Sequence, residues 1–178
     1  MNIPNSITLI RVILIPFFID LMIYGYYRPA LMVFVIACLT DALDGMIARL
    51  TNTKTSLGAF LDPVADKLLI VSSFVTLAIL RHLPTWLVII VVSRDVILAF
   101  GSFVITVTGH DLTIRPSVYG KITTFLQLIT VTLTLALIAY GIHTGYLKIA
   151  YWLSAVMTVV SGVQYVLQGM KLMSPERV

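Results

Sequence analysis

Hydrophobic residues in this chain form six long runs, separated by short connections that contain polar, glycine and proline residues. The runs cover residues 7–27, 30–48, 57–80, 84–107, 118–140 and 146–170. A helix of about 20 apolar residues can cross a bilayer while it bonds its backbone groups internally. The pattern therefore predicts an all-α, polytopic membrane protein with six transmembrane helices, in which residues 1–178 form one membrane domain.

The composition agrees with this prediction and excludes other classes of protein. Of the 178 residues, 59% are hydrophobic and only 11% are charged, whereas about a quarter are charged in soluble domains. The single cysteine, Cys38, excludes a disulfide framework and a cysteine metal cluster. The net charge of +4 is small and spread along the chain, so nucleic acid is not an expected partner.

The basic residues predict the orientation. The first six residues lack the basic segment and cleavage site of a secretory signal, so we expect the first run to stay as a span. Six spans place both termini on one side, and the positive-inside rule makes that side cytoplasmic in an integral protein of the cell (inner) membrane. The basic residues expected there are Arg49, Lys54, Arg115, Lys121, Lys171 and Arg177.

Four aspartates cluster where the second run ends and the third begins: Asp41, Asp44, Asp62 and Asp66. A charged residue at the centre of a membrane helix costs about 2.5–3.5 kcal/mol, so such residues need a function or a partner. Spacings of three and four place each pair on one helix face. A short connection makes the two helices antiparallel neighbours, so we expect the four carboxylates to meet in a polar, cytosol-facing active-site cavity.

Carboxylates that meet in this way need a counter-charge. Two like charges about 4 Å apart repel by about 4 kcal/mol at an effective dielectric of 20. Oxygen ligands with no nearby histidine or cysteine favour hard divalent cations, and a pair of such cations suits phosphoryl transfer. The alternative is a set of intramembrane salt bridges, but only Arg49 and Lys67 lie within this stretch to pair with four aspartates.

These residues resemble the signature of the CDP-alcohol phosphotransferases, D-x2-D-G-x2-A-R-x8-G-x3-D-x3-D. Every position matches: Asp41, Asp44, Gly45, Ala48, Arg49, Gly58, Asp62 and Asp66. The resemblance implies transfer of a phosphatidyl group from CDP-diacylglycerol to an alcohol, with release of CMP. It also implies a homodimer among membrane lipids and two divalent cations, Mg2+ or Mn2+, with Ca2+ as an inhibitory occupant.

The resemblance further implies roles for single residues. Asp41, Asp44 and Asp62 would be metal ligands, and Asp66 would be both a metal ligand and the catalytic base. The CDP-binding wall would consist of Asp44, Gly45, Ala48, Arg49 and Gly58. The small residues Gly45, Ala48 and Gly58 would equally suit close helix packing, which is compatible with a role in binding.

The opening residues, Asn2 to Arg11, resemble those of the phosphatidylglycerophosphate synthase and cardiolipin synthase branches. Asn5, Thr8 and Arg11 share one helix face by their spacing, and we expect them to border the nucleotide site. The alternative is that Asn5 only caps the helix and Arg11 extends to the lipid headgroups.

The acceptor residues by resemblance are Arg94, Arg115 and Lys121, enough positive charge for one phosphate. Phosphatidylglycerophosphate synthases often carry two further basic residues where this chain has Ser102 and Thr123. Residues 93–96 and 120–124 look rather more like the eukaryotic-type cardiolipin synthases. The acceptor is therefore left open between glycerol-3-phosphate and phosphatidylglycerol, and Arg94 could instead pair with Asp95.

Other functions compete with this one. The same chemistry could act on inositol phosphate or serine. A membrane cation carrier would also use clustered aspartates, but the chain lacks the two related halves expected of many carriers. A non-catalytic membrane scaffold would give no reason for the four aspartates.

Overall fold

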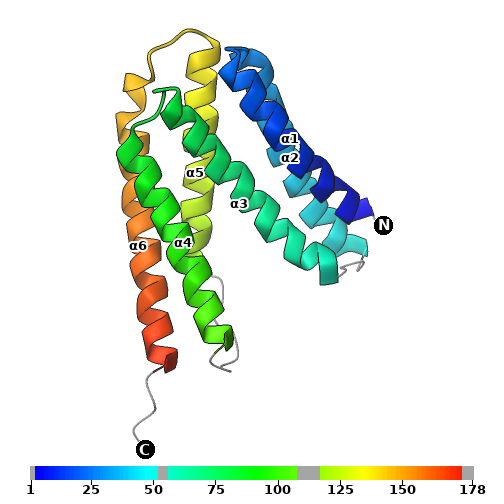
Figure 1. The fold of residues 1–178 in the computed structure, drawn as a ribbon, viewed down its shortest axis with the longest axis vertical. Helices are drawn as coiled ribbons and strands as arrows, with labels where there is room; N and C mark the ends of the chain where they lie inside the picture. The colour runs from blue at the N-terminus through cyan, green and yellow to red at the C-terminus, as the bar shows by residue number, and fades with distance from the viewer. Residues whose placement is uncertain (1–2, 52–55, 108–116, 174–178) are drawn as a thin grey trace, which may run out of the picture. The chain divides into compact units, whose positions relative to one another are not determined.

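The computed structural model describes residues 3–51, 56–107 and 117–173, and Figure 1 shows their helices. These are α1 (Ile3–Ile23), α2 (Tyr27–Thr51), α3 (Ser56–Ile79), α4 (Thr85–Val107), α5 (Val118–Ala139) and α6 (Lys148–Met173), with a short 3-10 helix, η1 (Thr144–Leu147), before α6. Side chains are described in these ranges except at residues 3–7, 42–51, 56–63, 105, 106 and 171–173. The predicted all-α class is confirmed for this part of the chain.

Among the residues that the structure describes, three segments have the length and composition needed to cross a membrane: Thr85–Val104, Val118–Ala139 and Thr144–Met170. They correspond to the last three of the six predicted spans. The topology with six spans and two cytoplasmic termini stays a prediction.

The turn between α1 and α2 differs from the predicted position. The sequence placed the break at Arg28 and Pro29, but α2 already begins at Tyr27. Proline is tolerated in the first turn of a helix, where backbone N–H groups lack helical acceptors. The reversal instead occurs at Gly25, whose φ of +76° is accessible to glycine without strain.

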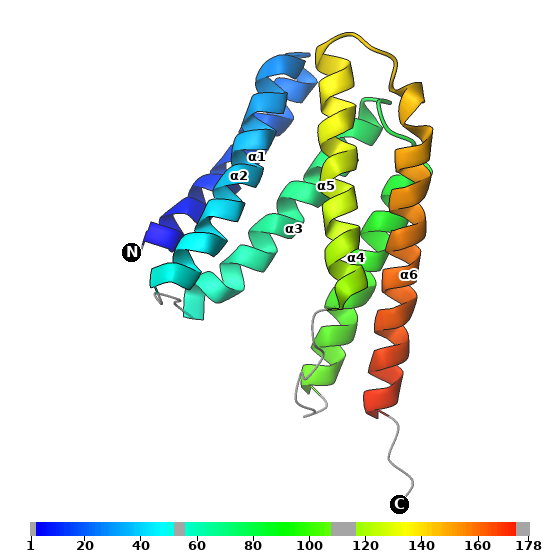
Figure 2. The ribbon, with the colours of Figure 1, turned by 180° about the vertical axis from the view of Figure 1, so that it is seen from behind.

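The chain forms two compact units, and the first comprises Met1–Leu83 and Val131–Tyr146. In this unit α1 packs against both α2 and α3. The rings of Phe18 and Phe34 lie 5.8 Å apart in the core. The carboxyl end of α2 and the amino end of α3 lie at the same end of the unit as the amino terminus (Figures 1 and 2). This is the antiparallel arrangement that the short connection between the second and third runs predicts.

The second unit comprises Pro84–Thr130 and Leu147–Val178. Its helices α5 and α6 share a seam of buried polar side chains. The Thr123 hydroxyl lies 2.9 Å from the carbonyl of Met157, and the Thr130 and Ser154 hydroxyls lie 2.6 Å apart. Buried hydroxyls that bond across a helix interface are a common means of association between membrane helices. The seam therefore fixes the register of α5 against α6.

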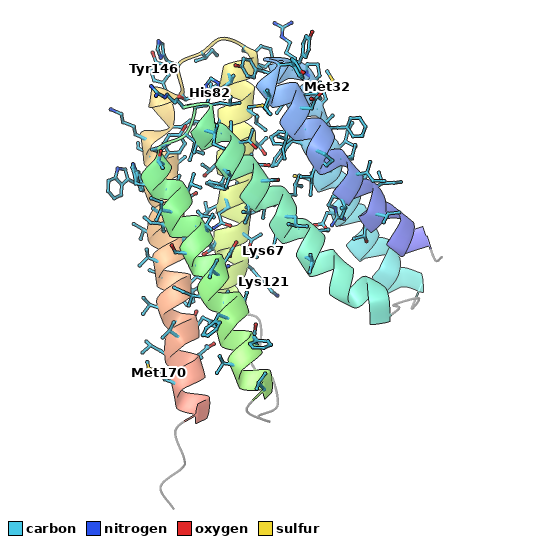
Figure 3. The ribbon with its side chains drawn as sticks, viewed as in Figure 1. Met32, Lys67, His82, Lys121, Tyr146 and Met170 are labelled. Carbon is cyan, nitrogen blue, oxygen red and sulfur yellow. The ribbon has the colours of Figure 1, made fainter. Side chains whose placement is uncertain are left out.

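The turn that follows α3 carries a partly buried histidine, His82 (Figure 3). Its ring stands edge-on to the ring of Tyr27, and its Nε2 lies 3.4 Å from the Tyr27 hydroxyl. Burial lowers the pKa of His82 below its ordinary value of 6.5. The folded protein therefore favours neutral His82.

We expect His82→Gln to flatten the dependence of stability on pH in the acid range. The unfolded chain protonates this histidine below about pH 6.5, whereas the folded protein resists protonation, so the contribution is lost as the pH falls. Melting temperatures in detergent at pH 7.5 and 5.5 would measure the difference, which should be small because His82 is only partly buried. The same exchange at exposed His143 controls for loss of an imidazole. An unchanged pH dependence in His82→Gln would contradict the prediction.

Candidate functional site

A single guanidinium nitrogen joins three helices of the first unit. Nη1 of Arg11, on α1, lies 2.8 Å from Oδ1 of Asp41 on α2. The same nitrogen donates a hydrogen bond of 2.5 Å to Oδ1 of Asp66 on α3. Asp41 of α2 and Asp66 of α3 thus come together around Arg11, and the convergence of all four aspartates stays a prediction.

The remaining members of the predicted cluster lie among side chains outside the described part. These are Asp44, Gly45, Ala48, Arg49, Gly58, Asp62 and Asn5. Lys67, on α3 (Figure 3), is described and half-buried. The geometry reported for the carboxylate site therefore rests on Asp41 and Asp66.

Arg11 corrects two interpretations made from the sequence. Its side chain is fully buried, so it does not extend to lipid headgroups. In addition, Arg49 and Lys67 are not the only candidate partners of the aspartates, because Arg11 reaches two of them from another helix. The usable signal was the position of Arg11 inside an apolar run, because an arginine there needs a partner. Thr8, one turn earlier, is also buried, as a shared face predicts.

The three charges differ in their access to solvent. The side chains of Asp41 and Asp66 are 42% and 38% exposed, whereas that of Arg11 is inaccessible. The two carboxylates thus lie on the partly exposed side, and the guanidinium lies behind them. Carboxylate oxygens are the kind of donor that suits a hard divalent cation.

The described residues alone do not complete such a site. Among the side chains that the structure describes, no group of three or more His, Cys, Asp or Glu residues could hold a metal ion. Asp44 and Asp62, the other predicted ligands, lie outside that part. The two carboxylates beside Arg11 therefore account for half of the predicted donor set.

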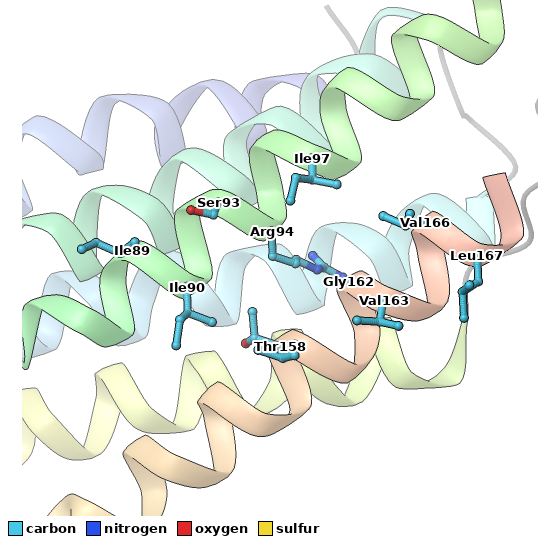
Figure 4. Close-up of a pocket in the computed structure, with 11 residues that line it drawn as sticks. Ile89, Ile90, Ser93, Arg94, Ile97, Thr158, Gly162, Val163, Val166 and Leu167 are labelled. Atoms are coloured by element: carbon cyan, nitrogen blue, oxygen red, sulfur yellow. The ribbon is translucent and has the colours of Figure 1, made fainter. Parts of the chain in front are cut away.

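A second buried arginine lies in the other unit. Arg94, on α4, donates through Nη1 to Oδ1 of Asp95 at 2.8 Å and through Nη2 to Oγ of Ser161 on α6 at 2.8 Å. Figure 4 shows its side chain reaching toward α6 beside Gly162. A Cβ atom at Gly162 would lie 3.3 Å from Cγ of Arg94, so glycine leaves room for the arginine stem. The pairing with Asp95 that the sequence left open is present.

Arg94 also borders the groove drawn in Figure 4. The groove lies between α4 and α6 and has a volume of about 420 Å³. Its lining is apolar except for Ser93, Arg94 and Thr158. It is therefore not the polar cavity expected around the aspartates.

The other predicted acceptor residues have different surroundings. Lys121 is exposed in the first turn of α5 (Figure 3). Its neighbour Gly120 is close to the Arg94 guanidinium, since a Cβ atom there would lie 3.6 Å from Nη2. Arg115 lies outside the described residues. Arg94 and the start of α5 thus come together within the second unit.

The two positions that lack the further basic residues are occupied by internally bonded hydroxyls. Thr123 is fully buried between α5 and α6. The Ser102 hydroxyl lies 2.9 Å from the carbonyl of Leu98 in its own helix. A lysine at position 123 would have to displace the contact with α6. Among the described residues, the two positively charged side chains predicted for the acceptor, Arg94 and Lys121, belong to this unit.

Comparisons with known proteins agree with the sequence signature. The profile of the CDP-alcohol phosphatidyltransferase family matches residues 1–160, which include Arg11, Asp41, Asp66 and Arg94. A Bacillus subtilis (strain 168) protein named CDP-diacylglycerol–glycerol-3-phosphate 3-phosphatidyltransferase is 33% identical, over 92% of this chain and 93% of its own length. An Escherichia coli (strain K12) protein of the same name is 35% identical, over 92% of each chain. A probable phosphatidylglycerophosphate synthase of Mycobacterium tuberculosis is 31% identical, over 96% of this chain and 82% of its own.

We expect Arg94→Met to destabilise the protein and the double variant Arg94→Met/Asp95→Leu to recover most of the loss. Removing one member of a buried ion pair leaves the other charge without compensation and typically costs about 3–5 kcal/mol, whereas an apolar replacement of both is often tolerated. Thermal unfolding of the purified proteins in one detergent would measure both effects. A double variant as unstable as the single one would contradict the prediction.

Proposed function

This chain belongs to the CDP-alcohol phosphatidyltransferase family, and we propose that it transfers the phosphatidyl group of CDP-diacylglycerol to glycerol-3-phosphate, with release of CMP. The observation that carries the proposal is the meeting of Asp41 and Asp66, from two helices, at one partly exposed site. Both belong to the family signature, and the family match spans them.

In the proposed reaction the acceptor hydroxyl attacks the β-phosphorus of CDP-diacylglycerol. The new bond joins the acceptor oxygen to that phosphorus, the bond to the bridging oxygen breaks, and CMP leaves. Asp66 takes the proton of the attacking hydroxyl. An ionised carboxylate is an acceptor only and can act as a general base. A substrate hydroxyl can reach Asp66, because its side chain is 38% exposed.

The donor nucleotide is proposed to bind at the carboxylate end of the first unit. Asp44, Gly45, Ala48, Arg49 and Gly58 would form the wall that accepts CDP, with Asn5 and Thr8 at its border. Arg49 would bind the diphosphate, because a guanidinium can donate two parallel hydrogen bonds to phosphate oxygens. Gly45, Ala48 and Gly58 would leave room for the nucleotide against the helix backbone.

Family membership implies a general dependence on divalent metal. We propose two ions, Mg2+ or Mn2+, held by Asp41, Asp44, Asp62 and Asp66, with Ca2+ as an inhibitory occupant. Bound there, they would neutralise the diphosphate and stabilise the departing oxygen. The described part of the site supports this role because its donors are partly exposed carboxylate oxygens.

The names of the relatives favour glycerol-3-phosphate as the acceptor. Two of them are named for glycerol-3-phosphate as acceptor, and they cover nearly the whole chain. Arg94, Arg115 and Lys121 would supply positive charge for its phosphate. Nη1 and Nη2 of Arg94 already donate hydrogen bonds to Asp95 and Ser161. Its Nε is buried and has no hydrogen-bond partner among the described residues. Phosphatidylglycerol, the other acceptor considered from the sequence, would give cardiolipin.

The proposed setting is the inner membrane. The enzyme would work there as a homodimer with cytoplasmic termini, and its two units would act as one membrane domain. The long apolar segments of the second half of the chain support membrane insertion. The substrate CDP-diacylglycerol is itself a lipid, so an embedded site can take it from the bilayer.

Purified protein supplied with CDP-diacylglycerol and Mg2+ or Mn2+ should release CMP when glycerol-3-phosphate is added. Parallel reactions with phosphatidylglycerol, inositol phosphate and serine, analysed by mass spectrometry, would identify the acceptor. Phosphatidylglycerophosphate should be the main product, and EDTA should stop its formation. Cardiolipin as the main product would overturn the proposed acceptor, and no CMP release with any acceptor would overturn the reaction.

Asp66→Asn should lower kcat by about 10²–10⁴-fold, the usual contribution of a general base. The amide keeps an oxygen that can accept the hydrogen bond from Arg11, so the melting temperature should change little. Asp20→Asn, at an exposed aspartate of α1, is the matched control and should retain wild-type turnover. Near-wild-type turnover in Asp66→Asn would remove this residue from the role of base.

A further inference from the structure

We infer that Arg11 is a positioning residue: its guanidinium is a permanent built-in cation that holds Asp41 and Asp66 in place before any divalent ion binds. The inference rests on the proposed function, because it takes these two aspartates as cation ligands. The sequence signature does not include Arg11, which comes from α1. Its role follows from the contacts of one nitrogen atom with two carboxylates.

The burial pattern gives the three groups different roles. Arg11 is enclosed by the helices, whereas the two carboxylates reach the surface of the unit. A ligand approaching from the exposed side therefore meets the carboxylates before it can meet Arg11. The arginine is placed to act on the reaction through Asp41 and Asp66, and not by touching the substrate itself.

Charge and shape explain why an arginine suits this position. The guanidinium stays protonated at every working pH, so the counter-charge is always present. Its rigid planar donors fix the direction of each hydrogen bond, whereas a lysine ammonium is a point charge on a flexible stem. Arg11 thereby limits the repulsion that would otherwise drive Asp41 and Asp66 apart in the metal-free enzyme. Small misplacements of reacting groups are costly in rate, so this positioning matters for turnover.

The same charge has a second consequence. A positive group in contact with the ligand oxygens repels any divalent cation that binds to them. Arg11 would therefore weaken cation binding while it improves the geometry of the ligands. These two effects have opposite signs, which distinguishes the inference from a simple packing role. An arginine that only joined helices would affect folding and not cation affinity.

The test uses Arg11→Met, which keeps an apolar stem without the charge, and Arg11→Lys, which keeps the charge without the planar fork. In EDTA, Arg11→Met should melt about 5–15 °C below wild type, because two carboxylates lose their counter-charge. Adding Mn2+ should restore most of that loss. The free Mn2+ concentration at half-saturation, measured by electron paramagnetic resonance, should fall about tenfold or more.

Turnover should fall, although the affinity for Mn2+ rises. At saturating Mn2+, Arg11→Met should release CMP at least about tenfold more slowly than wild type, because the carboxylates are less well placed. Arg11→Lys should keep the melting temperature in EDTA and the Mn2+ affinity near wild type, but should remain slow. Such a split between affinity and turnover is not expected from a general loss of structure.

Arg94→Met is the control for the loss of a buried arginine. In the wild-type protein the Arg94 guanidinium contacts Asp95 and Ser161. The Arg94→Met variant should melt lower in EDTA and in Mn2+ alike, with unchanged Mn2+ affinity. The inference is overturned if Arg11→Met behaves in the same way. It is also overturned if Arg11→Met cannot be recovered folded even with Mn2+, because a divalent ion should replace the missing charge. If the wild-type protein binds no Mn2+, the metal site of the proposed function is contradicted instead.

Discussion

The first unit depends on one contact, in which a guanidinium nitrogen buried on α1 lies between carboxylates of α2 and α3. All three charges come from helices with strongly apolar sequences, where an unpaired charge would be costly. Their mutual contact makes burial of the arginine tolerable. It also brings together two carboxylates that belong to the family signature.

The second unit solves the same problem of buried polarity by a different arrangement. Arg94 pairs with its neighbour in sequence, Asp95, and with Ser161 on the facing helix. Gly162 leaves room for its stem, and the hydroxyls of α5 and α6 continue the polar seam. Arg94 thus contacts one carboxylate, whereas Arg11 contacts two.

The proposed reaction assigns different chemistry to these two environments. The donor diphosphate and its cations need acidic ligands, and the acceptor phosphate needs basic groups. Helix α5 contributes residues to both units, since Val118–Thr130 belong to one and Val131–Ala139 to the other. The hydroxyls at Ser102 and Thr123 are bonded inside the protein and supply no positive charge. Acceptor capture in the proposed reaction would therefore rely on a small number of positive charges.

The sequence by itself determined the all-α class and the approximate helix limits, and it predicted that Asp41 and Asp66 lie near each other. Hydrophobic run length and residue spacing are local properties, so they can be read without a fold. The sequence did not determine that Arg11 contacts Asp41 and Asp66, or that Arg94 donates a hydrogen bond to Ser161. It also misplaced the first turn at Pro29 instead of Gly25. Those features depend on which side chains from distant parts of the chain meet, and only the tertiary packing of the helices decides that.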